Sequence, residues 1–475
     1  MASHLTSNVT DLAGGVENIG HNSANKEKPL LVFCAAPVAG HTHPILRIAA
    51  ELVKRGYDLC FITGPQFRDQ LGRLGVEHIE IPDMPSEAQE KARQEIPAGP
   101  PRFIWDLKHL FLDQIPLQYS AMKGVLEKLH KRDPSRRIII MHETLYLGVL
   151  PFIFGAPLPE GFTSFPKVIN LNIVPIVVTS IDTAPFGPGL PPDSTPSGRA
   201  RNKLLYEQMS GGPFVDLTAH SNEIFKSIGV TSEPVGFLFD TWLTSYDVTL
   251  QMCPPSLEYP RSDLHPSFKF AGCLPPRPPG PDYPYPEWWN EVAANTTGKK
   301  IVAVAQGTVA VDFMDLVIPT IQGLAGREDT LVVAILGSKG ATLPDDVVAN
   351  LPANARVIDY LPYDALLPHT DVFVMNGGYG GVMHGIVNGV PLVLAGDTED
   401  KPETVMRAEW AGVAVNLRTG RPTAEQVAAG VDEVLGNNKY KERALQIMKE
   451  NEDLDAMGVV ERQIRAMAEQ SSGES

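Results

Sequence analysis

The 475-residue chain is poor in cysteine and in positive charge. Its four cysteines, at positions 34, 60, 253 and 273, have no CxxC spacing. We therefore expect neither a disulfide framework nor a zinc site, and the scattered thiols fit a reducing cytosol. The net charge of −16 and the pI near 5.2 argue against nucleic acid or an anionic membrane as a main partner. These properties predict a cytoplasmic protein.

A long uninterrupted apolar run is also lacking. The longest apolar stretch, residues 138–158, contains His142 and Glu143 and ends in proline-rich sequence, which favours a buried strand with a loop over a membrane span. Residues 1–28 are polar, with no basic start followed by an apolar core, so we expect a disordered tail and no signal peptide. No hydrophobic segment follows at the C-terminus.

The sequence does contain a glycine-rich unit at residues 371–400. Its apolar run, Val372 to Met375, predicts a buried strand, and glycines follow at positions 377, 378, 380 and 381. A helical pattern then leads to Asn388-Gly389, which stops the helix before a strand predicted at residues 390–395. In such a parallel unit a glycine turn can bring a phosphate to a helix N-terminus. A tight turn that serves only packing is the alternative.

A second unit of the same kind occupies residues 29–63. A strand at 30–35 is followed by a loop at 37–43 and by a helix that we expect to begin at Pro44. The loop carries Gly40 and His41. A histidine here either caps the helix or acts as a general base, which the positive end of the helix would keep neutral near pH 7.

Together these units resemble the UDP-glycosyltransferases with the two-domain GT-B fold. The nucleotide-sugar signature of that family reads roughly HCGWNS…E…GVP…P…DQ. Residues 376–381 lie on its first part, residues 389–391 on GVP, and Asp400-Lys401 on DQ. The N-terminal unit matches the family's GHxxP at Gly40, His41 and Pro44. The resemblance implies an α/β protein whose two Rossmann-like domains, each with a parallel sheet, face each other across a cleft.

Three positions depart from this signature. Asn376 replaces a histidine that contacts phosphate, His384 replaces a glutamate that binds ribose, and Lys401 replaces a glutamine that helps to hold the sugar. An asparagine can still donate to phosphate and a histidine can bond a hydroxyl, but Lys401 brings a cation to the sugar site. The resemblance further implies nucleotide-sugar contacts at Gly40, Gly307, Thr308, Tyr360, Leu361, Gly377, Gly378, Gly380, Gly381 and Asp400.

The same resemblance makes His41 the catalytic base, with His43 as a weaker candidate. In the family an acidic residue after a later strand orients this histidine, and aligning the end of the strand at residues 137–141 puts Glu143 at that position. A solvent-facing carboxylate is the alternative for Glu143. The family transfers its sugar with inversion, and the glycine-built phosphate site leads us to expect no metal or other cofactor besides the UDP-sugar co-substrate.

Aromatic residues predict the acceptor side. They are Phe103, Trp105 and Phe111 in the segment 82–118, Phe186 in the loop-rich segment 152–196, and Tyr146 and Tyr379 next to the two motifs. Such residues suit a small, flat, hydrophobic acceptor that carries a hydroxyl, although packing in a helical core would explain the same spacing.

The chain is long enough for at least two domains. We expect an acceptor-binding domain at residues 29–253, a proline-rich linker at 254–298, a UDP-sugar-binding domain at 299–445, and a helix at 446–475 that returns to the first domain. The predicted protein is a monomer or weak dimer that transfers glucose. A nucleotide-sugar epimerase and a UDP-binding pseudoenzyme on the same fold remain as alternatives.

Overall fold

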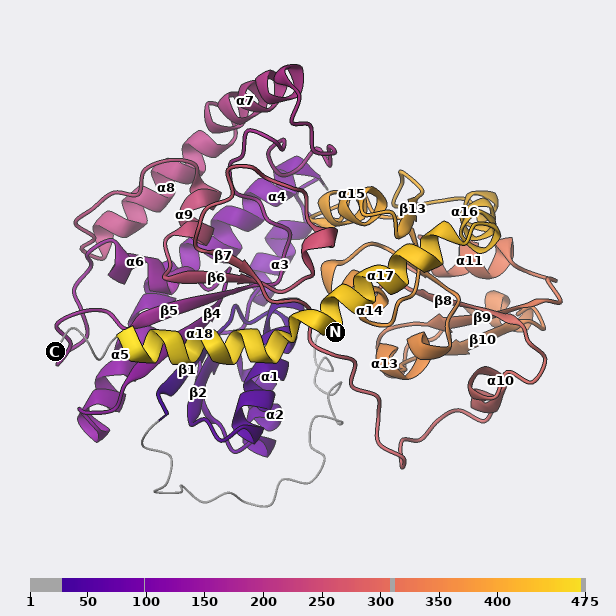
Figure 1. Ribbon diagram of the computed structural model, residues 1–475, viewed down its shortest axis with the longest axis horizontal. Helices are drawn as coiled ribbons and strands as arrows, with labels where there is room; N and C mark the ends of the chain where they lie inside the picture. Colours follow the sequence, from indigo (N-terminus) through magenta and orange to yellow (C-terminus); the bar gives the residue numbers. More distant parts are fainter. Residues whose placement is uncertain (1–27, 98, 308–311, 471–475) are drawn as a thin grey trace.

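The computed structural model describes residues 28–97, 99–307 and 312–470. It contains two α/β domains, each built on one parallel sheet, which lie side by side in Figure 1. Apart from Lys28, the tail expected at residues 1–28 falls outside the described residues. The two sheets agree with the predicted fold class.

The first domain has a seven-stranded sheet in the order β3-β2-β1-β4-β5-β6-β7. Its central strand β1 is buried along its whole length, with Val32 between Cys60 of β2 and Ile140 of β4. Burial on both faces explains why the central strands are continuous apolar runs. The strands are β1 (Leu30–Cys34), β2 (Leu59–Thr63), β3 (Glu77–Glu80), β4 (Ile138–Glu143), β5 (Lys167–Asn172), β6 (Val248–Gln251) and β7 (Phe268–Phe270).

Helices cover both faces of this sheet. One face packs against α1, α2 and the last helix of the chain, α18, and the other against α5, α6, α8 and α9. The helices of this domain are α1 (Ala39–Lys54), α2 (Arg68–Arg73), α3 (Glu87–Gln94), α4 (Pro100–Asp106), α5 (Ile115–Arg132), α6 (Leu150–Ile153), α7 (Pro196–Ser210), α8 (Phe214–Ser227) and α9 (Leu238–Thr244).

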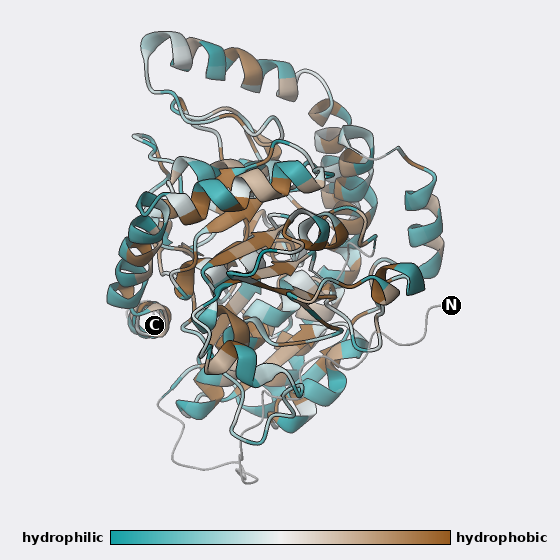
Figure 2. Ribbon diagram, turned by 90° about the vertical axis from the view of Figure 1, so that its right-hand side faces the viewer, coloured by the Kyte–Doolittle hydropathy of each residue, from teal (hydrophilic) through white to brown (hydrophobic). Residues whose placement is uncertain are grey.

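The second domain has a six-stranded sheet in the order β10-β9-β8-β11-β12-β13. Its strands are β8 (Lys300–Ala305), β9 (Thr330–Ile335), β10 (Ala355–Ile358), β11 (Val372–Met375), β12 (Leu392–Leu394) and β13 (Ala414–Asn416). Its helices are α10 (Trp289–Ala293), α11 (Val317–Gly323), α12 (Asp345–Ala349), α13 (Tyr363–Leu366), α14 (Tyr379–Val387), α15 (Lys401–Trp410), α16 (Ala424–Gly436) and α17 (Lys439–Leu454), followed by α18 (Ala456–Gln470). Figure 2 shows the apolar strands inside and hydrophilic helix faces outside.

The strand order reverses once in each sheet. In the first sheet the reversal lies between β1 and β4, and in the second between β8 and β11. Ligands of open parallel sheets bind beyond the carboxyl ends of the strands at such a point. The fold therefore places the segments after these four strands where a site is expected.

Several boundaries differ from those predicted. Helix α1 begins at Ala39, not at Pro44, so the expected loop at 37–43 is largely helical. Pro44 removes only the hydrogen bond to the carbonyl of Gly40, which is exposed and can be solvated. Strand β7 lies inside the segment expected to be the linker, which extends the first sheet further along the chain.

The C-terminal segment forms two helices. Asp455, with a φ of 55°, separates α17 from α18. The buried residues of α18, including Val460 and Ile464, pack in the core of the first domain, and Figure 1 shows this yellow helix lying across it. Throughout the described part of the chain, we find no helix with the length and apolar character needed to cross a membrane.

Candidate active site

His41 and Glu143 meet where the strand order of the first sheet reverses. His41 lies in the first turn of α1, just after β1, and Glu143 is the last residue of the adjacent strand β4. Nδ1 of His41 is 2.8 Å from Oε1 of Glu143. The structure thus brings together the two residues that sequence reasoning assigned to one catalytic pair.

Backbone groups hold Glu143 in this orientation. Its side chain is fully buried, and its Oε1 also accepts a hydrogen bond from the N–H of Leu145 at 3.1 Å. The N–H of Ala36 approaches Oε2 at 3.5 Å. A carboxylate fixed in this way orients the imidazole that it contacts.

The surroundings of His41 favour its protonated form. Burial lowers the pKa of His41, but the charge of Glu143, the hydrogen bond to it and the charge of Asp400 together raise the pKa above 6.5. This differs from our expectation that the ring is kept neutral, because two carboxylates favour the charged imidazolium more than burial disfavours it. Asp400 belongs to the second domain and follows Glu399, which Arg93 of the first domain approaches at 3.5 Å.

The neighbouring histidines have packing roles. The ring of His43 lies edge-on to Phe67, with 5.4 Å between the centroids, and burial lowers the pKa of His43. His142 is fully buried beside Tyr246, and burial lowers its pKa to about 4. His41 is therefore the histidine whose surroundings best suit a base.

In the second domain, the glycine turn joins β11 to α14. The helix begins at Tyr379, within the glycine cluster, and its N-cap is Gly378. Nδ2 of Asn376 donates a hydrogen bond of 2.6 Å to the carbonyl of Gln306, so Asn376 ties the end of β11 to the end of β8. One amide hydrogen of Asn376 is thus used within the protein.

Gly377 and Gly380 meet different requirements. Gly377 has a φ of +79°, and a Cβ there would lie 2.3 Å from Cγ2 of Val405, so the position requires glycine. A Cβ at Gly380 would meet nothing within 4 Å. Open space therefore adjoins the first turn of α14, where the helix dipole favours an anion.

His384 has a carboxylate partner that sequence reasoning missed. Its Nδ1 is 2.9 Å from Oδ1 of Asp364 in α13, while Oδ2 of Asp364 accepts a 2.6 Å hydrogen bond from the N–H of Arg277. A ribose hydroxyl would consequently have to bond Nε2 of His384. No local pattern marks Asp364 in the sequence, because its partners come from other segments.

The other predicted nucleotide contacts are placed as follows. Gly307 follows β8 with a φ of 76°, and Thr308 lies outside the described residues. Tyr360 is half-buried after β10. The side chain of Leu361 is buried in the core of the second domain, so any contact there would involve its backbone. Gly40 and Gly381 lie in the first turns of α1 and α14.

Asp400 is the N-cap residue of α15 and belongs to a charged segment. Burial raises the pKa of Asp400, against the opposing effects of the charges on Lys401 and His41. The ammonium of Lys401 contacts Oε2 of Glu399, and Nη2 of Arg93 in the first domain lies 3.5 Å from the other oxygen of Glu399. Lys401, which replaces a glutamine of the family signature, is therefore paired with the neighbouring carboxylate of Glu399.

Four of the predicted acceptor residues gather near His41 and the loop after β5. The ring of Phe111 is 6.5 Å from that of His41, and Phe103 stacks on Phe186 with 5.2 Å between centroids. Trp105 and Phe111 both pack on a small apolar cluster made of Ala36, Met84 and Leu110. Of these rings, Phe111 lies beside the imidazole, while Phe186 is largely buried against Phe103.

The other two predicted acceptor residues have different places. Tyr146 is fully buried, and its hydroxyl donates to the carbonyl of Gln118 at 2.9 Å. Tyr379 is 8% exposed, and its hydroxyl accepts a 2.9 Å hydrogen bond from Nε2 of Gln251. Core and interdomain packing thus use both side chains in this structure.

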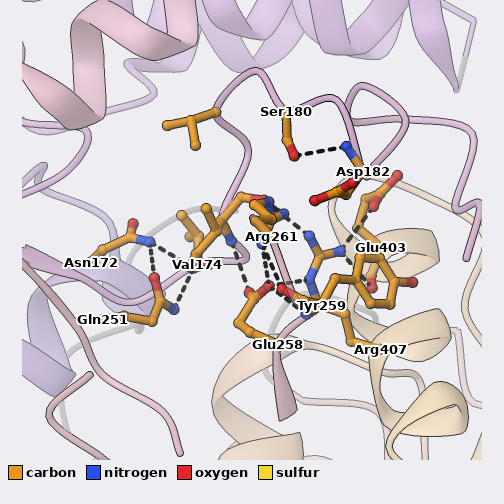
Figure 3. Close-up of polar contacts among 12 residues, drawn as sticks. Asn172, Val174, Ser180, Asp182, Gln251, Glu258, Tyr259, Arg261, Glu403 and Arg407 are labelled. Carbon is orange, nitrogen blue, oxygen red and sulfur yellow. Dashed lines mark hydrogen bonds and ion pairs between the residues drawn. The ribbon is translucent and has the colours of Figure 1, made fainter. Parts of the chain in front are cut away.

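Sequence reasoning also missed a buried ion-pair network between the domains, shown in Figure 3. Arg407 of α15 bonds Glu403 at 2.9 Å and Glu258 at 2.9 Å, and it donates to the carbonyl of Ile176 at 2.9 Å. Glu403 and Arg407 are four residues apart on one helix, a spacing typical of surface pairs. The spacing alone gave no sign that both would be buried.

We also looked for cavities and metal sites among the described residues. A cavity of about 580 Å³ lies near the ends of α15, α16 and α17, lined among others by Gly412, Glu433 and Arg443, and none of the predicted site residues lines it. Among the described residues, no group of three or more His, Cys, Asp or Glu side chains is placed to hold a metal ion.

Related proteins named as glucosyltransferases match nearly the whole chain. The sequence is 42% identical over 447 residues to UDP-glucosyltransferase 1 of Beauveria bassiana, a match that covers 93% of this chain and 96% of that protein. It is 36% identical over 459 residues to UDP-glucosyltransferase A1 of Starmerella bombicola, with 95% of each chain covered. It is also 33% identical to 4'-demethylrebeccamycin synthase of Lentzea aerocolonigenes, over 90% of this chain and 96% of that one.

A family model and solved structures agree with these matches. The model described as the C-terminal domain of erythromycin biosynthesis protein CIII-like proteins matches residues 323–461. The crystal structure of the glycosyltransferase of kitacinnamycin superposes with a TM-score of 0.66 at 19% identity, covering 92% of this chain and 99% of that one. The spinosyn rhamnosyltransferase with bound thymidine diphosphate gives a TM-score of 0.59 at 16% identity, over 92% of this chain and 100% of that one.

Proposed function

This chain belongs to the UDP-glycosyltransferase family, and we propose that it transfers glucose from UDP-glucose to a hydroxyl of a small apolar or aromatic acceptor, with inversion at the anomeric carbon. The observation that carries the proposal is the His41–Glu143 pair of one domain facing Asp400 of the other. The names of the relatives support UDP-glucose as the donor, and one relative is named for a natural product.

The first domain supplies the base. His41 takes the proton of the acceptor hydroxyl at Nε2, because Nδ1 is bonded to Glu143. As the imidazole becomes charged, the buried carboxylate of Glu143 stabilises it and holds its orientation. The apolar surface formed by Phe103, Trp105, Phe111 and Phe186 binds the flat body of the acceptor.

The second domain supplies the donor site. The diphosphate lies at the N-terminus of α14 beside Gly380, where backbone N–H groups and the helix dipole stabilise its charge without a metal ion. Asp400 accepts hydrogen bonds from the sugar hydroxyls, and Nε2 of His384 bonds the ribose.

The chemical step then follows from these positions. The acceptor oxygen attacks the anomeric carbon from the side opposite the diphosphate, while the bond from that carbon to the UDP oxygen breaks. The acceptor proton passes to His41, and UDP leaves with the bonding electron pair. A single in-line displacement of this kind inverts the anomeric centre. We also propose that the enzyme works in the cytoplasm as a monomer or weak dimer.

A screen of phenolic acceptors with UDP-glucose, read by the mass of the product, tests the proposal. Glucosylated product that is absent with His41→Ala would support it. A parallel incubation without acceptor separates the alternatives, since epimerised sugar would indicate an epimerase. UDP binding without product from any acceptor would indicate a pseudoenzyme and overturn the proposal.

A further inference from the structure

Glu403 connects the second domain to a loop beside the acceptor residues. Its Oε1 accepts hydrogen bonds from the N–H groups of Gly187 at 2.8 Å and Gly189 at 2.9 Å, both in the first domain. We call residues 185–189 the Phe186 loop. A Cβ at Gly189 would lie 3.0 Å from the carbonyl oxygen of Pro402, so the loop lies directly on α15. Phe186, within this loop, stacks on Phe103.

The second oxygen of Glu403 is held just as firmly. Nη1 of Arg407 donates to Oε2 of Glu403 at 2.9 Å, and the side chains of Arg407 and Glu403 are 4% and 6% exposed. Nε of Arg407 reaches Glu258, whose Oε1 accepts a 2.8 Å hydrogen bond from the N–H of Ile176. Figure 3 shows Glu403, Arg407 and Glu258 converging at this junction. Both carboxylate oxygens of Glu403 are thus used inside the interface.

A second connection between the domains is weaker. Arg93 approaches Glu399 at 3.5 Å, and the side chain of Glu399 is 46% exposed. Exposed ion pairs contribute little to stability, whereas removing one member of a buried pair leaves an uncompensated buried charge and is costly. Glu403, together with Arg407, which donates to the carbonyl of Ile176, therefore forms the main buried polar connection between α15 and the acceptor side.

We propose that Glu403 is a positioning residue that fixes the Phe186 loop to α15, so that the acceptor wall is held in register with the donor sugar. Asp400 occupies the N-cap position of the same helix, three residues before Glu403. One short helix therefore carries both the carboxylate assigned to the sugar and the carboxylate that holds the acceptor wall. The inference rests on the proposed function for its kinetic consequence, but the anchor itself can be measured without turnover.

The test compares Glu403→Gln with Glu409→Gln as a matched control. Glu409 lies on the same helix, and its carboxylate pairs with Arg418 at the surface. Amide hydrogen exchange of residues 185–189 reports on the anchor. Initial rates with UDP-glucose and 4-methylumbelliferone report the KM of each substrate, and melting temperature with UDP binding reports the folded fraction.

For E403Q we expect loop amides that exchange roughly ten times faster or more, because glutamine is uncharged and its single acceptor oxygen cannot serve both the loop N–H groups and Arg407. A lost hydrogen bond to a charged group is worth about one to two decades. The acceptor KM should rise severalfold, while the UDP-glucose KM stays near the wild-type value. E409Q should change neither. A purely structural defect would lower the fraction of active enzyme and therefore kcat. It would not raise the acceptor KM while leaving the UDP-glucose KM unchanged.

Unchanged exchange of the loop in folded E403Q would overturn the proposal, and so would faster exchange with an unchanged acceptor KM. If E403Q does not fold, Glu403→Asp replaces it in the same measurements, because it keeps the charge but shortens the reach to the loop. A wild-type enzyme without turnover would count against the proposed function, while the exchange data would still decide whether Glu403 holds the loop.

Discussion

The imidazole of His41 lies 2.8 Å from the carboxylate of Glu143, although 102 positions separate the two residues in the chain. The adjacency of β1 and β4 in the sheet produces this contact, because Glu143 ends β4 and His41 lies in the helix that follows β1. The pair carries the first two predictions.

Replacing His41 by alanine should lower kcat by roughly 10²–10⁴-fold, the usual contribution of a general base. UDP binding should change little, because the diphosphate site belongs to the other domain. Steady-state rates and calorimetric titration with UDP check both expectations. Turnover close to wild type in this variant would rule out His41 as the base.

The pH profile should reflect the raised pKa of His41. A base must be neutral, so the acid limb of kcat/KM should lie above pH 6.5, the ordinary value for histidine. Glu143→Gln removes the charge that raises this pKa, so it should shift the limb to lower pH while reducing kcat. The free energy of unfolding should change with pH in the opposite direction to activity. The His41–Glu143 pair stabilises the fold below pH 6.5, and this contribution is lost as pH rises through the folded-state pKa of His41. A limb that stays in place in Glu143→Gln would contradict the assignment.

Donor choice should depend on the pairing of Lys401 with Glu399. With its charge paired, Lys401 should leave UDP-glucose as the preferred donor. Glu399→Gln frees the ammonium, so the rate ratio of UDP-glucuronic acid to UDP-glucose should rise about tenfold or more, the worth of one charged hydrogen bond. The double variant with Lys401→Gln is the control and should restore the preference for UDP-glucose. A ratio that is equal in all three proteins would show that this pair does not set donor choice.

Two glycines of the turn should separate folding from binding. Gly377→Ala should destabilise the fold by about 1–3 kcal/mol, since it combines a positive φ with a close approach to Val405. Gly380→Ala should not destabilise it, because space is open there and alanine favours a helix over glycine by about 0.5–1 kcal/mol. Its methyl group should instead weaken UDP binding. Chemical denaturation and UDP titration distinguish the two, and unchanged UDP affinity in Gly380→Ala would place the diphosphate elsewhere.

Activity should survive EDTA. The proposed phosphate site relies on the N-terminus of α14 and its backbone N–H groups to stabilise the charge of the leaving diphosphate. Rates measured after dialysis against EDTA, with and without added Mg²⁺ or Mn²⁺, check this. Activity lost on chelation and restored by either ion would show that a metal takes part.

The sequence by itself determined the two-domain α/β fold and its main motifs. Strands β1 and β11, the helix stop at Asn388-Gly389 and the placement of His41 beside a helix N-terminus all follow from apolar periodicity and from glycine, which act over a few residues. The family resemblance added the pairing of His41 with Glu143, which no local pattern specifies.

Tertiary structure decided which side chains are available and which charges are paired. It buried Tyr146 and Tyr379, paired Lys401 with Glu399, gave His384 the partner Asp364, and placed Glu403 against the loop of the other domain. Burial and long-range hydrogen bonds depend on how the two domains pack, and nothing in the local sequence records that packing. A glutamate four residues before an arginine has the same pattern at a surface and in an interface, and only the second domain's contact with the Phe186 loop distinguishes them.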